Sequence, residues 1–312
     1  MKNRPFLLCI GGPTGSGKTE LAITLYHKYG WPIISADSRQ VYRYLDIGTN
    51  KVSQAIQAEV PHFLVDIRYP DEIFSAGKFV QEVEALLSRW NETSIVQVVG
   101  GTGFYIHALL YGLDEIPSVP MELRQDIEHW RQAEGIGALV RWLEVHDPLT
   151  ASRIDLRNPH RVQRAIEILK HTGRPWVSFW GKAQKTCRYP AYVVVLSPPR
   201  DKLYQAIATR TYKQVLSGWL EETVFVLAKG YSPAVPGLQT LGYKECLKVL
   251  RGESSHKTLY ENITRANRDY ARRQLTWWRH HPPDSWIEEF PSETLCVRVA
   301  KEVLRRVEDA PR

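Results

Sequence analysis

Short runs of apolar residues, each ended by glycine, aspartate or serine, recur along the chain. They are FLLCIGG (6–12), WPIISAD (31–37), HFLVDI (62–67), SIVQVVGG (94–101) and, much later, AYVVVLSPP (191–199). Continuous apolar runs of this length are typical of strands buried on both faces of a parallel sheet. Segments with helical spacing separate them. The pattern therefore predicts an α/β fold, an open parallel sheet flanked by helices.

A long stretch from Leu113 to Tyr189 has no comparable strand signal. It predicts an inserted helical domain, 113–189, between two parts of a core, 1–112 and 190–312. Within the insertion, Asn158 as cap, Pro159 in the first turn and Gly173 as stop predict one helix. Residues 200 to 312 again have mostly helical spacing, with turns at KGYSPAVPG and HHPPDS.

The segment GPTGSGKT has the spacing Gly-x-x-x-x-Gly-Lys-Thr, between the first apolar run and a helical pattern. In this setting backbone N–H groups at a helix start bind phosphate oxygens. Lys18 would neutralise phosphate charge and Thr19 would hold Mg²⁺. A glycine-rich turn without a ligand would not need the lysine. We expect phosphate contacts from the whole loop: Gly12, Pro13, Thr14, Gly15, Ser16, Gly17, Lys18 and Thr19.

Two further turns follow apolar runs, at the sheet edge where ligands of open α/β folds collect. In ISADSRQVY (34–42), Asp37 and Gln40 fit a helix capping box, but Asp37 could equally act as a base or metal ligand. In Gly-Gly-Thr-Gly (100–103), Thr102 is either a helix cap or a ligand-binding residue. Asp66, after HFLV, is an alternative metal-holding carboxylate.

The charge pattern favours a polyanionic partner. The chain has 41 Lys and Arg against 34 Asp and Glu, a net charge of +7. In the stretch 259–281, helical spacing puts four arginines on one side and five apolar residues on another: Arg265, Arg268, Arg272 and Arg279 against Leu259, Ile263, Ala266, Tyr270 and Trp277. Such a face is either solvated surface or a contact for RNA. Arg161 and Arg164, close to Arg153 and Arg157, form a second basic patch and favour RNA.

Other sequence features exclude several classes of protein. The longest apolar runs are far shorter than the roughly 18 residues of a membrane span, and FLLCI is too short for a signal-peptide core. We therefore expect a cytoplasmic protein that does not enter membranes. The four cysteines are too far apart for a zinc site, and we expect reduced thiols: Cys9, Cys187, Cys246 and Cys296.

Taken together, the motifs resemble those of the bacterial tRNA dimethylallyltransferases, also called tRNA isopentenyltransferases. The resemblance is collinear over roughly residues 5 to 280. It runs through GPTGSGKT, SADSRQVYRYLDIGT, VPHFLVDIRYPDEIFSAGKF, VVGGTGFYIHALLYGLDEIPSVPMELR, NPHRVQRAIEI, LQTLGYKE and RDYARRQLTWWR. The phosphate loop is shared with many enzymes, whereas ADSRQVY with DIGT, and GYKE with YARRQLTW, are specific to this family. The resemblance to this family implies a P-loop kinase-like core.

The resemblance implies a reaction. A dimethylallyl group passes from dimethylallyl diphosphate to N6 of the adenosine just 3′ of the anticodon, in the anticodon stem-loop of tRNA. Asp37 matches the general base. Lys18, Thr102 and Arg210 match groups that act on the diphosphate, with Mg²⁺ on Thr19. We expect the protein to act as a monomer.

The resemblance also implies which residues contact tRNA. They are Asp37, Ser38, Arg39, Gln40, Thr102, Arg124, His160, Arg161, Val162, Gln163, Arg164, Gln239, Thr240, Leu241, Gly242, Tyr243, Lys244, Arg268 and Arg272. The chain departs from the family pattern at Tyr44-Leu45, usually Gly-Met, and at Asn267, usually Thr. Three alternatives remain: an isopentenyltransferase acting on free adenine nucleotides, a P-loop small-molecule kinase, and a non-catalytic RNA-binding protein.

Overall fold

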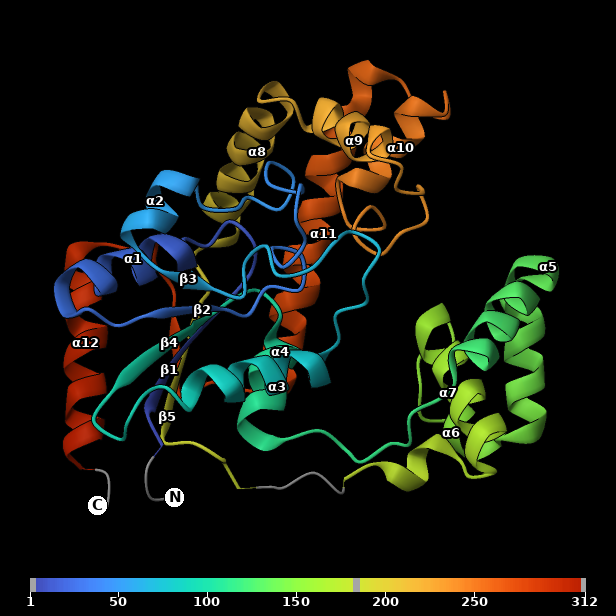
Figure 1. Ribbon diagram of the computed structural model, residues 1–312, viewed down its shortest axis with the longest axis horizontal. Helices are drawn as coiled ribbons and strands as arrows, with labels where there is room; N and C mark the ends of the chain where they lie inside the picture. Colours follow the sequence, from blue (N-terminus) through green and yellow to red (C-terminus); the bar gives the residue numbers. More distant parts are fainter. Residues whose placement is uncertain (1–3, 182–185, 310–312) are drawn as a thin grey trace. The chain divides into compact units, whose positions relative to one another are not determined.

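The computed structural model describes residues 4–181 and 186–309. The chain divides into two compact units (Figure 1). The first, the core unit, comprises Met1–Leu110 and Cys187–Arg312. The second, the inserted unit, is Tyr111–Thr186. Each unit has its own hydrophobic core.

The core unit is built on one sheet of parallel strands in the order β3-β2-β4-β1-β5-β6. The strands are β1 (Phe6–Gly11), β2 (Ile33–Ser35), β3 (His62–Phe63), β4 (Ile95–Val99), β5 (Ala191–Leu196) and β6 (Ser285–Ile287). The five predicted apolar runs form β1 to β5, so the expected open parallel sheet is confirmed. Strand β6 was not predicted, because a three-residue edge strand that is only partly buried has no apolar run.

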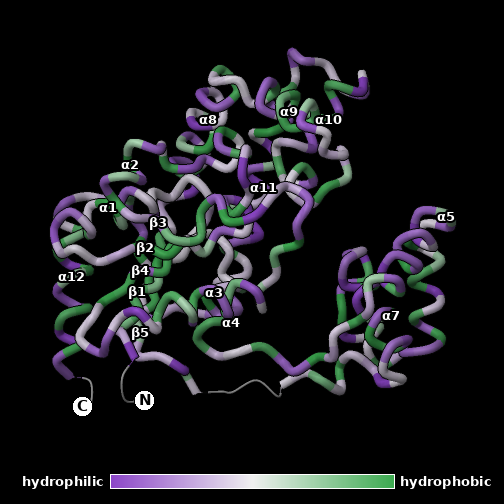
Figure 2. Tube along the Cα trace, viewed as in Figure 1, coloured by the Kyte–Doolittle hydropathy of each residue, from purple (hydrophilic) through white to green (hydrophobic). Residues whose placement is uncertain are grey.

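Helices cover both faces of this sheet. On one face, α1 (Lys18–Tyr29) and α12 (Glu293–Glu308) pack over Leu8 and Ile10 of the central strand β1. On the other face lie α3 (Ala76–Leu87) and α4 (Gly103–Tyr111) (Figure 1). The strands form the hydrophobic centre between these layers (Figure 2). Loops that leave the carboxyl ends of the strands are therefore held on a rigid base.

The rest of the core unit is helical. Its elements are α2 (Gln54–Glu59), α8 (Arg200–Leu216), α9 (Trp219–Ala228), α10 (Tyr243–Leu250), η2 (His256–Thr258) and α11 (Leu259–His280). Helix α11 packs against α8 and α10. Its buried side includes the polar residues Asn267 and Gln274, whereas Tyr270 and Trp277 are only partly buried. The predicted apolar side of this helix was thus partly wrong, because α11 packs against polar loops as well as apolar side chains.

The inserted unit is helical, as its sequence predicts. It consists of α5 (Met121–His146), α6 (Pro148–Ala151), α7 (Pro159–Thr172) and η1 (Trp176–Phe179). The predicted cap is confirmed, since the Asn158 side chain accepts hydrogen bonds from the amides of His160 and Arg161. Gly173 ends α7 with a φ of 67°, in the left-handed region. None of the helices in the described ranges of either unit is long and apolar enough to cross a membrane.

Candidate active site

The phosphate loop joins β1 to α1. Gly12, Gly15 and Gly17 have φ values of 138°, 83° and 86°, which side-chain-bearing residues rarely adopt. Gly17 is the N-cap of α1, and no side chain caps the helix. The first amides of α1 are therefore left without an internal acceptor, which is the arrangement that binds an anion.

Two cations face this loop from different helices. Lys18 Nζ donates a hydrogen bond to the Pro13 carbonyl oxygen at 2.6 Å, and Arg210 Nη2 of α8 donates to Thr14 Oγ1 at 2.7 Å. Burial, with a smaller contribution from Arg210, lowers the pKa of Lys18 to about 7, although Asp37 opposes the shift. Burial also lowers the pKa of Arg210 to about 10. Both groups are short of compensating negative charge, so an anion bound here would stabilise their charged forms.

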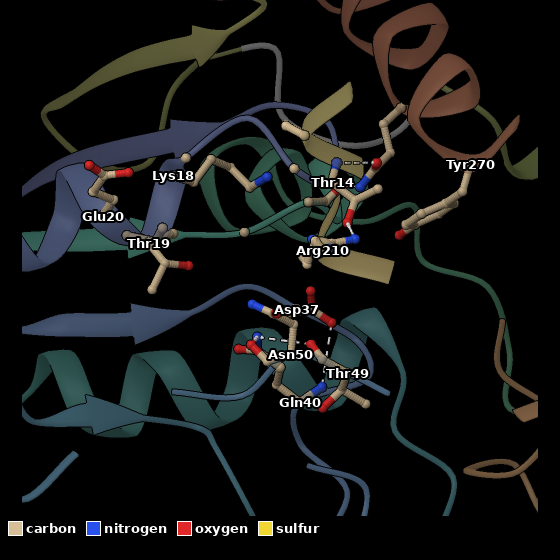
Figure 3. A pocket seen from close by; sticks show the side chains of 17 residues that line it. Thr14, Lys18, Thr19, Glu20, Asp37, Gln40, Thr49, Asn50, Arg210 and Tyr270 are labelled. Atoms are coloured by element: carbon tan, nitrogen blue, oxygen red, sulfur yellow. Dashed lines mark hydrogen bonds between the residues drawn. The ribbon is translucent and has the colours of Figure 1, made fainter. Parts of the chain in front are cut away.

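The phosphate loop, the turn after β2 and helix α11 enclose a cavity of about 310 Å³. Figure 3 shows Lys18 and Arg210 on one side of it and Asp37 on the other, with the Tyr270 hydroxyl directed toward the same space. The Thr19 side chain also lines it. The structure therefore brings three of the four predicted catalytic residues to one cavity.

Asp37 shapes a turn and keeps one oxygen available. Its Oδ1 accepts hydrogen bonds from the backbone N–H groups of Arg39, at 2.8 Å, and Gln40, at 3.4 Å. Gln40 does not complete a capping box, because its amide nitrogen donates to the carbonyls of Thr49 and Asn50 and no helix begins here. Asp37 Oδ2 has no hydrogen-bond partner in the described part of the chain, so it can accept a proton.

Thr102, the fourth predicted catalytic residue, joins the turn after β4 to the turn that holds Asp37. Its hydroxyl accepts the Ser38 backbone N–H at 3.2 Å, and its own N–H donates to the Ala36 carbonyl at 3.3 Å. Tyr270 also lines the cavity; burial and the charge of Asp37 raise the pKa of its hydroxyl to about 12. The Thr102 hydroxyl therefore connects the two turns, while Thr102 directly precedes the first residue of α4.

Gln274 of α11 was not identified from the sequence. Its Oε1 accepts the Thr14 backbone N–H and its Nε2 donates to the Gly101 carbonyl, both at 2.8 Å. The side chain is 6% exposed. It therefore ties the phosphate loop to the turn that carries Thr102. The sequence signal that could have identified Gln274 is its helical spacing from Ala271 and Trp278, which places a polar residue on the buried side of the helix.

A second cavity, of about 460 Å³, shares residues of the first, including Asp37 and Arg210. Several expected tRNA contacts line it: Arg39, Gln239, Thr240, Leu241 and Lys244. Tyr243 is instead fully buried, with its hydroxyl on Glu222. Gly242 is also a packing position, because a Cβ there would lie 1.8 Å from Trp219. The Tyr243 side chain is therefore unavailable to a ligand, and position 242 has no room for any side chain.

Two arginines expected to contact tRNA lie on α11, outside both of these cavities. The Arg268 guanidinium lies 5.2 Å from the centre of the Tyr204 ring. Arg272 pairs with Asp269 at 3.2 Å and lines a separate cavity of about 520 Å³ beside α8. They do not join the chemistry of the first cavity.

The remaining candidates belong to the inserted unit. Val162 is fully buried in the core of that unit, so we remove its side chain from the expected contacts. Arg164 pairs with Glu167 at 3.0 Å, and Gln163 hydrogen-bonds to Glu128. Arg124 lies 3.9 Å from the same Glu167. His160 and Arg161 are exposed at the start of α7.

The residues present fit a magnesium ion that is shared with a bound diphosphate. The described residues contain no cluster of three or more His, Cys, Asp or Glu that could hold a metal by themselves. Mg²⁺ often takes only one or two protein oxygens together with substrate phosphates and waters. Thr19 supplies such an oxygen in the cavity. Asp66 is excluded from this role, because its carboxylate forms an ion pair with Lys51 instead.

Comparison with known proteins matches this architecture to one family. Residues 40–281 match the family IPP transferase. The chain is 43% identical over 282 residues to the tRNA dimethylallyltransferase of Myxococcus xanthus, covering 89% of this chain and 91% of that protein. It is 38% identical over 289 residues to the tRNA dimethylallyltransferase of Desulfosudis oleivorans, covering 92% of each.

Solved structures agree. The full-length tRNA isopentenylpyrophosphate transferase of Bacillus halodurans superposes with a TM-score of 0.71 at 30% identity, over 98% of both chains. A eukaryotic dimethylallyltransferase acting on tRNA gives a TM-score of 0.78 over 98% of this chain and 80% of that one. Its identity of 22% supports the fold alone. The chain therefore belongs to the IPP transferase family.

Proposed function

We propose that this protein transfers a dimethylallyl group from dimethylallyl diphosphate to N6 of the adenosine 3′-adjacent to the anticodon in tRNA, and releases diphosphate. One observation carries the proposal. Asp37, which has an unpaired oxygen, lines the same cavity as the cations Lys18 and Arg210. A base and a site for a leaving anion are thereby placed around one reaction centre. We expect the protein to act as a monomer in the cytoplasm.

The phosphate loop binds the diphosphate of the donor. The amides at the start of α1, Lys18 and Arg210 are all directed at this part of the cavity. As the bond between C1 and the bridging oxygen breaks, the electron pair leaves with the diphosphate and its negative charge grows. Fixed donors that are already oriented stabilise this charge without reorganising. Thr19 would hold Mg²⁺, which would supply additional Lewis-acid stabilisation of the leaving group.

Asp37 accepts the proton. The bond from N6 to C1 forms as the C1–O bond breaks, and the amino group must lose one proton. Asp37 Oδ1 is held by two backbone amides, so the carboxylate is fixed while Oδ2 faces the cavity. A base positioned in this way contributes typically 10² to 10⁴ in rate.

The second cavity offers a route for the nucleotide. It continues from Asp37 and Arg210 to the segment 239–244, and Lys244 and Arg273 supply positive charge there. An adenosine must leave its stack to reach such a pocket, which costs least in a single-stranded loop. The anticodon loop meets this condition. We propose further tRNA contacts at the exposed His160 and Arg161 of the inserted unit.

The decisive experiment uses Asp37→Asn. Asparagine keeps the oxygen that accepts the two turn amides but replaces the free oxygen with an NH₂ group that cannot take a proton. Labelled dimethylallyl transfer to unmodified tRNA should slow by about 10² to 10⁴, with tRNA affinity nearly unchanged. Asp201→Asn, at an exposed position of α8, is the matched control. A variant of Asp37 with a normal transfer rate would contradict the assignment.

The donor can be tested directly. Incubation with tRNA and either labelled dimethylallyl diphosphate or labelled ATP should transfer label only from the first. Transfer of label from ATP to a small molecule would favour the kinase alternative. Transfer to free adenine nucleotides in preference to tRNA would favour the nucleotide-prenylating alternative.

A further inference from the structure

An exposed group of aromatic rings and cations in the core unit takes no part in the reaction above. We call it the aromatic platform; its residues are Arg43, Tyr44, Tyr69, Phe225, Lys229 and Tyr231. Tyr44 is its centre. The Tyr44 ring lies 6.2 Å from the rings of Tyr69 and Phe225 and 6.4 Å from that of Tyr231, measured between centroids. Residues from three separate segments thus converge on one tyrosine.

Two cations lie over these rings. Lys229 Nζ is 4.7 Å from the centroids of both Tyr44 and Phe225, and Arg43 Cζ is 4.7 Å from that of Tyr69. Neither cation forms an ion pair with any carboxylate in the residues described, as far as 4.0 Å. Tyr69 and Phe225 remain 41% and 51% exposed. Tyr44 is half-buried, so the platform presents partly exposed rings with positive charge lying over them.

The backbone conformation at Tyr44 is unfavourable for a residue that carries a side chain. Its φ of 69° lies in the left-handed region, where a non-glycine residue is strained. The family pattern that this sequence resembles has Gly-Met at positions 44 and 45, so glycine would remove that strain. The three aromatic contacts of Tyr44 offset this strain. An aromatic ring therefore stands at a position where the backbone favours glycine.

Hydrogen bonds fix the position of the platform, which follows the turn of the active site closely in sequence. Tyr44 lies only four residues beyond Gln40, the end of the turn that Asp37 shapes. The Arg43 backbone N–H donates to the Arg68 carbonyl at 2.8 Å, and its side chain donates to the Asp66 carbonyl and the Tyr69 hydroxyl, both at 2.9 Å. These hydrogen bonds fix Arg43 against the segment 66–69, so the platform is a surface of defined geometry.

The chemistry of the platform favours a base over a phosphate. Burial, together with the nearby carboxylates of Asp71 and Glu72, raises the pKa of Tyr231. Those carboxylates would repel a phosphate on that side. Exposed rings bordered by Lys and Arg suit the uncharged face of a base in single-stranded RNA, where stacking is tolerant of sequence.

We propose that the aromatic platform stacks an unpaired base of the bound tRNA, other than the reacting adenosine. The identity of the RNA rests on the proposed function, whereas the stacking site rests on the geometry of the platform. Because no bond changes at this surface, its effect is on binding and not on chemistry.

The test uses Tyr44→Gly, which removes the ring and relieves the backbone strain, so the fold should persist. The affinity for unmodified tRNA should fall by about 5- to 100-fold, as expected for one lost base stack. The KM for tRNA should rise while kcat and the affinity for inorganic diphosphate stay unchanged. The salt dependence of tRNA binding should keep its slope, because no phosphate contact is lost. Tyr212→Ala, at a tyrosine 55% exposed on α8 and outside the platform, is the matched control.

The outcomes separate the two proposals. If the wild type transfers dimethylallyl to tRNA and Tyr44→Gly binds tRNA normally, the platform is refuted and the function stands. If the wild type binds tRNA without transferring the group and Tyr44→Gly weakens binding, the platform stands and the function fails. A shallower salt slope in Tyr44→Gly, or a change in oligomeric state, would show a phosphate contact or a protein contact and overturn the stacking proposal.

Discussion

Replacing Gln274 should separate two loops that the reaction needs together. In Gln274→Met a side chain of similar volume fills the site, but the Thr14 N–H and the Gly101 carbonyl lose their partner. Leaving a buried polar group unpaired costs about 1–3 kcal/mol. Water from the adjoining cavity can reach Thr14, which is only partly buried, so its share lies at the lower end. We therefore expect a loss of about 2–4 kcal/mol in the free energy of unfolding.

Gln274→Glu distinguishes positioning from stability. Glutamate can still accept the Thr14 N–H, but it places a second oxygen against the Gly101 carbonyl and adds negative charge beside the phosphate loop. We expect the KM for dimethylallyl diphosphate to rise at least tenfold, with the KM for tRNA little changed. Because a displacement of about 1 Å can cost 10²-fold in rate, Gln274→Met should also lower kcat at full occupancy of both substrates.

Urea unfolding and steady-state transfer assays measure both effects. Thr276→Ala, two residues further along α11 and exposed, provides the control and should match the wild type in both. If Gln274→Met unfolds at the wild-type urea concentration and transfers at the wild-type rate, then this amide does not hold the two loops, and the reasoning fails.

Three other experiments follow from the site. Because the pKa of Lys18 is lowered to about 7, its side chain is mostly a neutral amine above that pH. This amine must gain a proton before it can bind an anion as an ammonium. The Kd for inorganic diphosphate, measured by calorimetry, should rise by up to tenfold per pH unit from pH 7, and Lys18→Arg should flatten this profile. Without ligand the sign is opposite: the unfolded chain binds the extra proton between pH 7 and 10.5, so the free energy of unfolding should rise with pH in that window. Chelation of Mg²⁺ with EDTA should abolish transfer while tRNA binding in a filter assay persists, and loss of tRNA binding would argue against a metal confined to the diphosphate. Glu222 accepts hydrogen bonds from the amides of residues 46, 47 and 48 and from the Tyr243 hydroxyl. Glu222→Gln should therefore lower the midpoint of thermal unfolding by several degrees, whereas Glu221→Gln, at an exposed neighbour, should leave it unchanged. Equal midpoints for the two variants would contradict this role of Glu222.

The sequence was a good guide wherever a single segment carried the signal. Continuous apolar runs predicted β1 to β5, and the cap residues predicted α7 correctly. The phosphate loop could be assigned to its strand and helix because glycine spacing and the lysine are local. Asp37 and Thr102 could be located at the right edge of the sheet but not given a single role, since a cap and a ligand have the same local pattern.

What could not be predicted depends on contacts between distant segments. Gln274 meets Thr14 across 260 positions, and no local pattern reveals that pairing. The same contact explains the glycine at position 101, because a Cβ there would lie 2.2 Å from the Gln274 amide nitrogen. Val162 was assigned to a binding motif, although its spacing equally suits the buried side of α7, where it lies. Motif membership alone does not distinguish the two.

The order of the segments along the chain has a consequence for synthesis. Strand β1 is central and pairs with β4 before the insertion and with β5 after it, and α11 reaches the loops near the end of the chain. The phosphate loop and the turn that carries Thr102 therefore leave the ribosome long before α11, the helix that joins them, has been synthesised. The phosphate loop becomes fixed only after α11 has been synthesised, so fragments ended before α11 should carry the motifs and still be inactive. Assembly of the site in this way makes activity a report of completed folding.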